Sequence, residues 1–284
     1  MIQSLGLIHQ AQTAVPEEAL PSGSSVEKEG KKDFALQQIP PEHVDIDPRS
    51  RIVVHNDPRG LAADRFRYLR MRLRELWSAG KVRKLLIASP LPQDGKSTVA
   101  LNLATALSER GRSSVLLIEA DLYRSPIAQL LGLKPGPGLA ECLETGLDPL
   151  SALRHLEPLG WYLLPAGKPV GNPGDLLHGE VFPKIMKTIS PHFDWVLVDS
   201  PPLMPITDAL ALAQQTDASL LVVRAGRTPR ETVDSAITAL GTKRVVGVVL
   251  NGVQGLGKLY SKYSGYHSYS SLAASTGRGD GPNR

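Results

Sequence analysis

The sequence predicts an α/β domain whose mostly parallel β-sheet is covered by helices on both faces. Two observations support this prediction. Short aliphatic runs of strand length, such as KLLIAS from residue 84 and SVLLIEAD from residue 114, recur along the chain, and continuous apolar runs are typical of parallel strands buried on both faces. Segments with helical periodicity separate these runs, and this alternation favours parallel strands joined by crossover helices.

Composition limits the class of protein. The 284 residues can form one large α/β domain with tails, and a hydrophobic fraction of 42% supplies a substantial core. Cys142 is the single cysteine, which excludes an internal disulfide and fits a reducing compartment. No apolar run approaches the length of a membrane helix, about 18 to 20 residues, and the N-terminus lacks the basic and apolar regions of a secretory signal. We therefore expect a soluble cytoplasmic protein.

The net charge of +4 is that of an ordinary protein surface. A mildly basic balance fits a nucleic acid, an anionic membrane face or an acidic partner without selecting one of them. No nucleic-acid-binding motif accompanies it, so we expect no nucleic-acid partner.

The predicted elements follow one another in a regular order. Residues 1–50 mix Pro, Glu, Lys, Gly and Ser without periodicity, which predicts a flexible leader. Residues 62–77 carry apolar side chains at three- and four-residue spacing and arginines elsewhere, which predicts an amphipathic helix. Within a domain of residues 51–253, we expect strands at residues 84–89, 114–121, 161–167, 194–202, 218–226 and 245–253, and helices at residues 97–111, 126–132, 138–145, 174–190, 205–214 and 229–241.

Residues 254–284 predict a mobile tail, because they are rich in Gly and Ser. Most of the chain's 7 tyrosines fall in this tail, and four of them recur at every third position: Tyr260, Tyr263, Tyr266 and Tyr269. The tail contains nothing that could bury these rings, so we expect their role to lie outside a packed core.

The motif with the most specific chemistry is SPLPQDGKST at residues 89–98, between a predicted strand and a predicted helix. In this context a loop ending in Gly-Lys-Ser/Thr is a P-loop, whose backbone N–H groups bind nucleotide phosphates together with the helix N-terminus. Lys96 would neutralise phosphate oxygens, Ser97 would coordinate Mg²⁺, and Thr98 would donate to the α-phosphate. Pro90 and Gln93 occupy positions where glycine is usual. The candidate residues for binding ATP are Pro92, Gln93, Asp94, Gly95, Lys96, Ser97 and Thr98.

Carboxylates end two of the predicted strands. Glu119 and Asp121 follow the second strand of the domain, and Asp199 follows the apolar run WVLV. Ligands of open parallel sheets bind at the carboxyl ends of strands. Because Mg·ATP chemistry needs one carboxylate for the metal and one to take a proton from the nucleophile, these three acids are the candidates for both roles.

These motifs together resemble the bacterial protein-tyrosine kinases of capsule and exopolysaccharide synthesis, the BY-kinase or CpsD/CapB family. The resemblance covers residues 58–270 and rests on SPLPQDGKST, LLIEADLYRSP, DWVLVDSPP, LPAGKPVGNPGDLL and the tyrosine-rich tail. It implies the fold of P-loop ATPases related to MinD and ParA, and autophosphorylation of the tail tyrosines between neighbouring subunits. It also implies phosphate and metal binding by Lys96 and Ser97, Mg²⁺ support by Asp121 and Asp199, proton acceptance at Glu119, and an adenine contact at Asn251.

The resemblance further implies an assembly. In the family, a helix with Glu-x-x-Arg-x-x-Arg builds a ring-shaped oligomer, and here Asp64, Arg67 and Arg70 occupy that spacing. The implied partner is a separate membrane-anchored activator of the polysaccharide chain-length-determinant type, which would recruit the protein to the inner face of the membrane. Position 119 departs from the pattern because it holds Glu where the family has Asp, and a displacement of roughly 1 Å can cost about 10²-fold in rate.

Two other functions remain open. One is a MinD/ParA-type regulatory ATPase that switches with its nucleotide, although Leu91 occupies the position of that group's signature lysine. The other is a catalytically weak nucleotide-binding partner of a polysaccharide assembly system. Neither alternative explains the tyrosine-rich tail.

Overall fold

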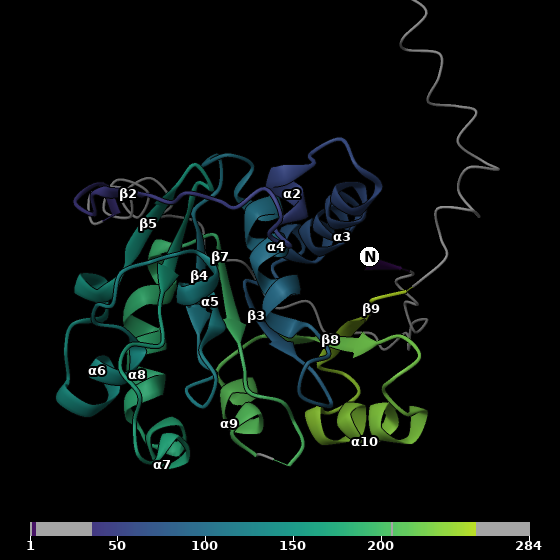
Figure 1. Cartoon of the computed structure of the whole chain (residues 1–284). Helices are drawn as coiled ribbons and strands as arrows, with labels where there is room; N and C mark the ends of the chain where they lie inside the picture. The colour runs from purple at the N-terminus through teal and green to yellow at the C-terminus, as the bar shows by residue number, and fades with distance from the viewer. Residues whose placement is uncertain (1, 4–35, 206, 254–284) are drawn as a thin grey trace, which may run out of the picture.

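The computed structural model describes residues 2–3, 36–205 and 207–253, which form a central sheet between two layers of helices (Figure 1). Nine strands in the described part of the chain are ordered β1-β9-β8-β3-β7-β4-β6-β5-β2. Their bounds are β1 Ile2–Gln3, β2 Pro41–His43, β3 Lys84–Ala88, β4 Val115–Glu119, β5 Arg154–Glu157, β6 Trp161–Leu164, β7 Trp195–Asp199, β8 Ala218–Arg224 and β9 Val245–Asn251. The six consecutive strands from β9 to β6 are all parallel to one another, which confirms the mostly parallel sheet.

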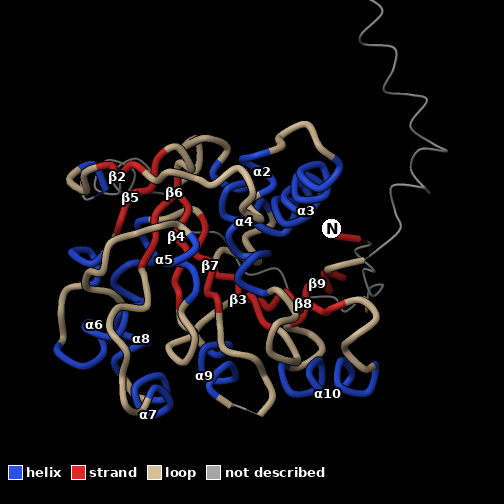
Figure 2. Tube along the Cα trace, viewed as in Figure 1, coloured by secondary structure: helices blue, strands red, loops and turns tan. Residues whose placement is uncertain are grey.

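The helices divide between the two faces of the sheet (Figure 2). One face carries α2 Val53–Asn56, α3 Leu61–Ser78, α4 Lys96–Ser108 and α5 Pro126–Leu130, and the other carries α6 Leu139–Thr145, α7 Pro173–His178, α8 Val181–Ile189, α9 Asp208–Gln214 and α10 Arg230–Leu240. Short 3-10 helices cover Pro149–Ala152 and Ser190–His192. The strands between these layers are almost wholly buried, as their uninterrupted aliphatic runs require.

Part of the predicted flexible leader is packed against the domain. Residues 41–43 form β2, which pairs with β5 in parallel and extends the sheet. Val44 and Ile46 are buried beside it. The composition around Pro40 and Pro41 concealed this strand, because prolines in a short run favour a loop or an edge strand. Residues 2–3 of the predicted leader form β1, which pairs with β9, whereas residues 4–35 and the predicted tail with Tyr260, Tyr263, Tyr266 and Tyr269 lie outside the described residues.

Other elements also differ from the predictions. The helix expected over residues 174–190 is two helices, α7 and α8, because Gly179 has extended backbone between them. The polar strand β5, which runs antiparallel to β6, escaped prediction because Arg154 and His155 interrupt its apolar character. Within the described residues, no helix combines the length and apolar character needed to span a bilayer.

The strand order determines where the site lies. β3 is flanked by β8 and β7, and β4 lies on the other side of β7. Since these strands are parallel, the loop after β3 lies at the same edge of the sheet as the acidic ends of β4 and β7.

Candidate active site

The loop between β3 and α4 has the geometry of a phosphate-binding loop. α4 begins at Lys96, and the preceding Gly95 has a φ of 98°. A Cβ at Gly95 would lie 2.0 Å from the amide nitrogen of Asn251, so both the backbone conformation and the space require glycine. The N-terminal N–H groups of this 13-residue helix therefore open onto the loop, where they favour an anion.

Asp94 and Asn251 were both predicted to contact the nucleotide. In the structure, both support the phosphate loop through hydrogen bonds within the protein. The buried Asp94 accepts hydrogen bonds from the Thr228 hydroxyl at 2.8 Å and the Leu91 N–H at 3.0 Å. The Asn251 side chain donates to the Asp94 carbonyl at 2.9 Å. These bonds tie the loop to the ends of β8 and β9. The adenine contact of Asn251 stays a prediction. The sequence motif did not indicate that Asn251 also supports the loop by its hydrogen bond to the Asp94 carbonyl.

Lys96 and Asp121 meet at the mouth of the loop. The Lys96 ammonium donates to one Asp121 carboxylate oxygen at 2.8 Å, and both side chains are largely buried. The other Asp121 oxygen accepts the Arg124 N–H at 3.0 Å, which orients the carboxylate. The predicted phosphate ligand and one predicted metal ligand are thus brought together from α4 and the end of β4.

Asp199 lies next to this pair, and within the described residues neither of its carboxylate oxygens has a hydrogen-bond partner of good geometry. Burial raises its pKa to about 7, while the Lys96 charge and the nearby Ser97 hydroxyl lower it. A buried, unpartnered carboxylate is costly, so this side chain is suited to a cation or to a metal-bound water. Asp199 and Ser97 fit Mg²⁺, which takes oxygen ligands and is commonly bound by one or two carboxylates plus nucleotide phosphates.

Glu119 occupies a different environment. One carboxylate oxygen accepts the Ile127 N–H at 2.5 Å and the other accepts the Ala166 N–H at 3.2 Å. The side chain is fully buried, and burial raises its pKa against the lowering effect of these backbone bonds. Glu119 therefore joins the end of β4 to the first turn of α5 and to the segment after β6. The Ser125-Pro126 helix start, whose free N–H groups need acceptors, was the available signal for this bond.

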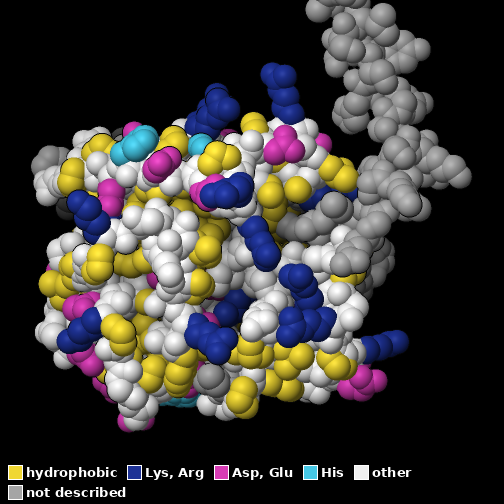
Figure 3. Space-filling model, viewed as in Figure 1, with side chains coloured by type: hydrophobic (Ala, Val, Ile, Leu, Met, Phe, Trp, Pro, Cys, Tyr) yellow, Lys and Arg dark blue, Asp and Glu magenta, His cyan; other side chains and the backbone are white. Residues whose placement is uncertain are grey.

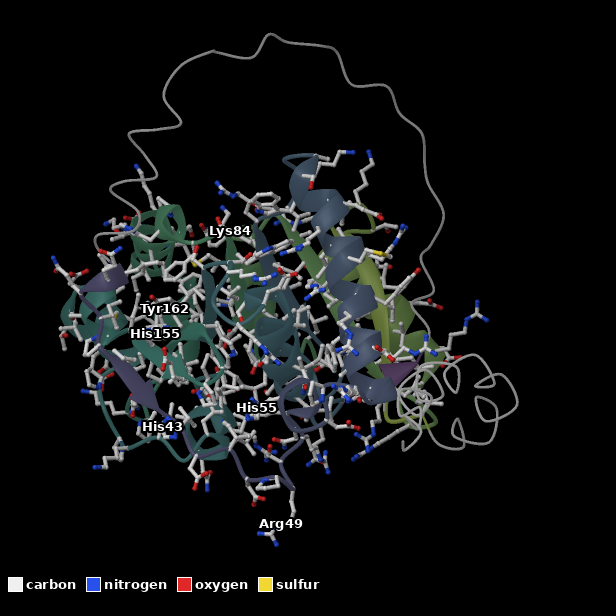
Figure 4. All side chains as sticks on the ribbon, turned by 90° about the horizontal axis from the view of Figure 1, so that it is seen from above. His43, Arg49, His55, Lys84, His155 and Tyr162 are labelled. Carbon is white, nitrogen blue, oxygen red and sulfur yellow. The ribbon has the colours of Figure 1, made fainter. Side chains whose placement is uncertain are left out.

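A cavity of about 1,090 Å³ opens over the loop. Lys and Arg side chains gather around a hollow in the face shown in Figure 3, in keeping with a cavity lining that includes Arg49, Arg51, Lys96, Arg124, Arg224 and Arg227. Asp121 is the one acidic residue of that lining in the described chain. This excess of positive charge attracts a polyphosphate. Arg49 extends outward from the body in Figure 4, so it contributes charge at the rim.

A second hollow, of about 740 Å³, lies beside the stacked rings of His155 and Tyr162, whose centroids are 4.4 Å apart (Figure 4). None of the predicted site residues that the structure describes lines it. The predicted chemistry therefore gathers around the first cavity.

The predicted interface residues on α3 already have partners within the chain. Asp64 pairs with Arg67, whose guanidinium also donates to the Pro58 carbonyl. Arg70 bonds Glu109 at 3.0 Å and the Ala106 carbonyl at 3.2 Å. Arg70 thus fastens α3 to the end of α4, and the oligomer contact stays a prediction for all three residues.

Comparison with known proteins adds a family to this geometry. A family model for ParA, described as "NUBPL iron-transfer P-loop NTPase", matches residues 82–252. Tyrosine-protein kinase ptk of Acinetobacter johnsonii is 30% identical over 68% of this chain and 27% of its own length. Tyrosine-protein kinase YwqD of Bacillus subtilis is 28% identical over 77% of this chain and 90% of its own length. This chain therefore spans about a quarter of the first relative and most of the second.

A solved structure gives the same result at the level of the fold. The kinase domain of Escherichia coli tyrosine kinase ETK superposes with a TM-score of 0.68 at 27% identity, covering 71% of this chain and 80% of that domain.

Proposed function

Because the chain belongs to the ParA family of P-loop NTPases and is similar to bacterial proteins named tyrosine-protein kinases, we propose that it is an ATP-dependent protein-tyrosine kinase. Its acceptors are its own tail tyrosines, Tyr260, Tyr263, Tyr266 and Tyr269, phosphorylated in trans between copies. The observation that most supports this function is the group of Lys96, Asp121 and the unpartnered Asp199 beneath one phosphate loop.

ATP would bind with its phosphates on the backbone N–H groups of residues 92–98. Lys96 would then turn from Asp121 to the phosphate oxygens, because a triphosphate offers more negative charge than one carboxylate. Ser97, Asp199 and Asp121 would hold Mg²⁺, which supplies charge neutralisation of the phosphates when bound. Asn251 and Asp94 keep the loop in the binding conformation through the bonds described above.

In the transfer, the tyrosine oxygen attacks the γ-phosphorus, the bond from that phosphorus to the ADP oxygen breaks, and the phenolic proton passes to a carboxylate. Glu119 is the acceptor suggested by the family. It would have to exchange one of its two backbone hydrogen bonds to do so. Asp121 lines the cavity and would lose its Lys96 partner on nucleotide binding, so it is the alternative acceptor in an arrangement where Ser97 and Asp199 alone hold Mg²⁺.

Glu119→Gln and Asp121→Asn separate the two candidates. A base at Glu119 requires Glu119→Gln to abolish transfer while Mg·ATP still binds. A base at Asp121 requires the larger loss of transfer in Asp121→Asn, with Glu119→Gln retaining measurable activity.

Autophosphorylation is tested with purified full-length chain and Mg·ATP. We expect phosphotyrosine in the tail of the wild type and none in Lys96→Ala. Mixing Lys96→Ala with a variant whose four tail tyrosines are changed to Phe tests transfer in trans. Phosphate on the Lys96→Ala tail supports trans transfer, and an unlabelled tail in that mixture contradicts it.

The surrounding system is also a proposal. The Succinoglycan biosynthesis transport protein ExoP of Rhizobium meliloti is 33% identical over 78% of this chain, so we place this chain in exopolysaccharide or capsule synthesis. A membrane-anchored polysaccharide co-polymerase would stimulate it and recruit it to the inner face of the membrane. Asp64, Arg67 and Arg70 would contribute to a ring-like homo-oligomer, in which Arg70 keeps its contact with Glu109.

The second candidate function is a ParA-type regulatory ATPase or a catalytically weak nucleotide-binding partner. The ParA family match and the enclosed Glu119 carboxylate favour it. It predicts ATP binding or hydrolysis with no phosphotyrosine on the tail.

A further inference from the structure

Tyr123 places an aromatic side chain in the cavity over the phosphate loop, although neither phosphate binding nor phosphate transfer requires an aromatic ring there. It follows Asp121 by two residues, lines the cavity over the phosphate loop, and is 47% exposed. Its hydroxyl donates to a carboxylate oxygen of Asp208 at 2.9 Å. The polar end of the side chain is therefore anchored, while part of its surface remains open to the cavity.

The Tyr123 hydroxyl is held by a hydrogen-bond network from α7 and α9, and we call this network its anchor. Asp208 begins α9 with a side chain only 6% exposed, and its second oxygen lies 3.0 Å from the Nε2 atom of His178 at the end of α7. A Cβ added to Gly174 would lie 3.4 Å from Asp208 and 3.6 Å from the Tyr123 hydroxyl, so α7 packs closely on both groups. Such a network fixes the ring, because the hydroxyl has a buried acceptor that would be left unpaired if Tyr123 swung away.

Tyr123 belongs to an apolar wall, which we define as Tyr123, Pro126 and Leu130. All three line the cavity, and Leu130 is 56% exposed. The wall lies on the β4–α5 side of the phosphate loop. The ends of β8 and β9, with Arg224 and Asn251, lie on the other side of the loop, where the adenine contact is predicted. The triphosphate is highly charged, so an apolar surface does not contribute to its binding.

We propose that this wall binds the phenol ring of the acceptor tyrosine, an inference that rests on the proposed kinase function. The occupant is a tail tyrosine of a copy of this chain. A phenol ring packs on Tyr123 in an offset or edge-to-face arrangement, beside the Lys96–Asp121 pair. A serine or threonine would lack that contact, so the wall favours tyrosine.

The place where the described chain ends supports this occupant. Val253 follows Asn251, whose side chain packs under the phosphate loop, so the tail departs from the edge of the sheet that carries the cavity. The 7 residues from Val253 to Tyr260 can extend over about 23 to 25 Å. A tail leaving at this edge can supply tyrosines to its own cavity or to that of an adjoining copy.

The test uses a peptide of residues 259–271 as acceptor and full-length enzyme whose four tail tyrosines are changed to Ser. Serine is chosen because a phenylalanine ring would compete for the wall. We expect Tyr123→Ala to raise the KM for the peptide about 2- to 12-fold, the value of one aromatic pair. The dissociation constant of Mg·ATP should stay within about twofold. Val181→Ala, on the exposed side of α8, is the matched surface truncation and should change neither quantity.

A double-mutant cycle tests whether Asp208 acts through Tyr123. Asp208→Asn alone should raise the peptide KM by a smaller factor, because the ring stays but its anchor weakens. In the Tyr123→Ala background the same change should have no further effect on that KM. Equal effects of Asp208→Asn in both backgrounds would overturn the anchoring role.

Binding is measured in parallel by fluorescence anisotropy of the labelled peptide, which needs no catalysis. An unchanged peptide affinity in Tyr123→Ala overturns the wall. A loss of Mg·ATP affinity equal to the loss of peptide affinity overturns it too, because the wall would then serve the nucleotide. Absence of phosphate transfer by the Ser-tail enzyme with its wild-type cavity would refute the proposed function, while the anisotropy result still decides the wall.

Discussion

Replacing Asp199 by Asn should separate stability from activity. Both carboxylate oxygens of Asp199 are buried, and neither has a hydrogen-bond partner in the part of the chain that the structure describes. Its pKa is raised to about 7 by burial, against 3.8 for an unperturbed aspartate. A raised pKa means that the folded protein holds this proton more tightly than the unfolded chain does. The associated stability is fully present below pH 3.8 and is lost as the pH rises through about 7.

The size of the effect follows from the two pKa values. At about 1.4 kcal/mol per pKa unit, the protonated carboxyl contributes about 4 kcal/mol at low pH, and about 2 to 3 kcal/mol of this is lost between pH 5 and pH 8. The amide introduced by Asp199→Asn does not titrate, so this variant should lack that part of the pH dependence. Urea unfolding of the wild type and Asp199→Asn at the two pH values, with EDTA present, measures the difference.

The same variant should lose phosphoryl transfer, because an amide does not replace a carboxylate toward Mg²⁺. Adding Mg·ADP should stabilise the wild type at pH 8 more than it stabilises Asp199→Asn. Equal pH dependence of unfolding in the two proteins would refute the assignment of an unpartnered, proton-binding carboxyl to position 199.

Three further substitutions test the loop and its supports. Gly95→Ala should abolish ATP binding in a fluorescent-nucleotide titration, because a Cβ there meets the Asn251 amide at a φ of 98°; unchanged affinity would contradict this geometry. Gln93→Gly should raise the unfolding free energy by about 0.5 to 1 kcal/mol, since Gln93 has a φ of 65°; a destabilised variant in urea would contradict strain at this residue. Glu109→Gln should cost about 1 kcal/mol by weakening the pairs with Arg70 and Arg74, and equal urea midpoints would show that the pairs contribute nothing.

The sheet was predictable because its signal is local. The central strands β3, β4, β7 and β8 are mostly apolar runs with nearly all residues buried, and burial on both faces leaves little other choice of residue. β2 and β5 were missed for the opposite reason. They are the last two strands at one end of the sheet, where polar residues such as Glu42 and Arg154 are tolerated and pair with each other across the strands.

The residues of the candidate site were also predictable only in part. The phosphate loop and the strand-end acids were visible as motifs, because their spacing along the chain is itself the signal. The partners of those residues were not visible, since they come from distant segments. Asp94 meets Thr228, Glu119 meets the Ala166 N–H, and Tyr123 meets Asp208 only after folding. Sequence patterns therefore located the chemistry, and tertiary packing decided which acids face the cavity.

The proposed activity is transfer of phosphate from ATP to the tail tyrosines of this chain. Mass spectrometry of the full-length protein after incubation with Mg·ATP tests it most directly. We expect phosphate on one or more of Tyr260, Tyr263, Tyr266 and Tyr269 in the wild type, and none in Lys96→Ala. ATP hydrolysis by the wild type with an unmodified tail, in the presence of a stimulating membrane partner, would rule out this kinase activity.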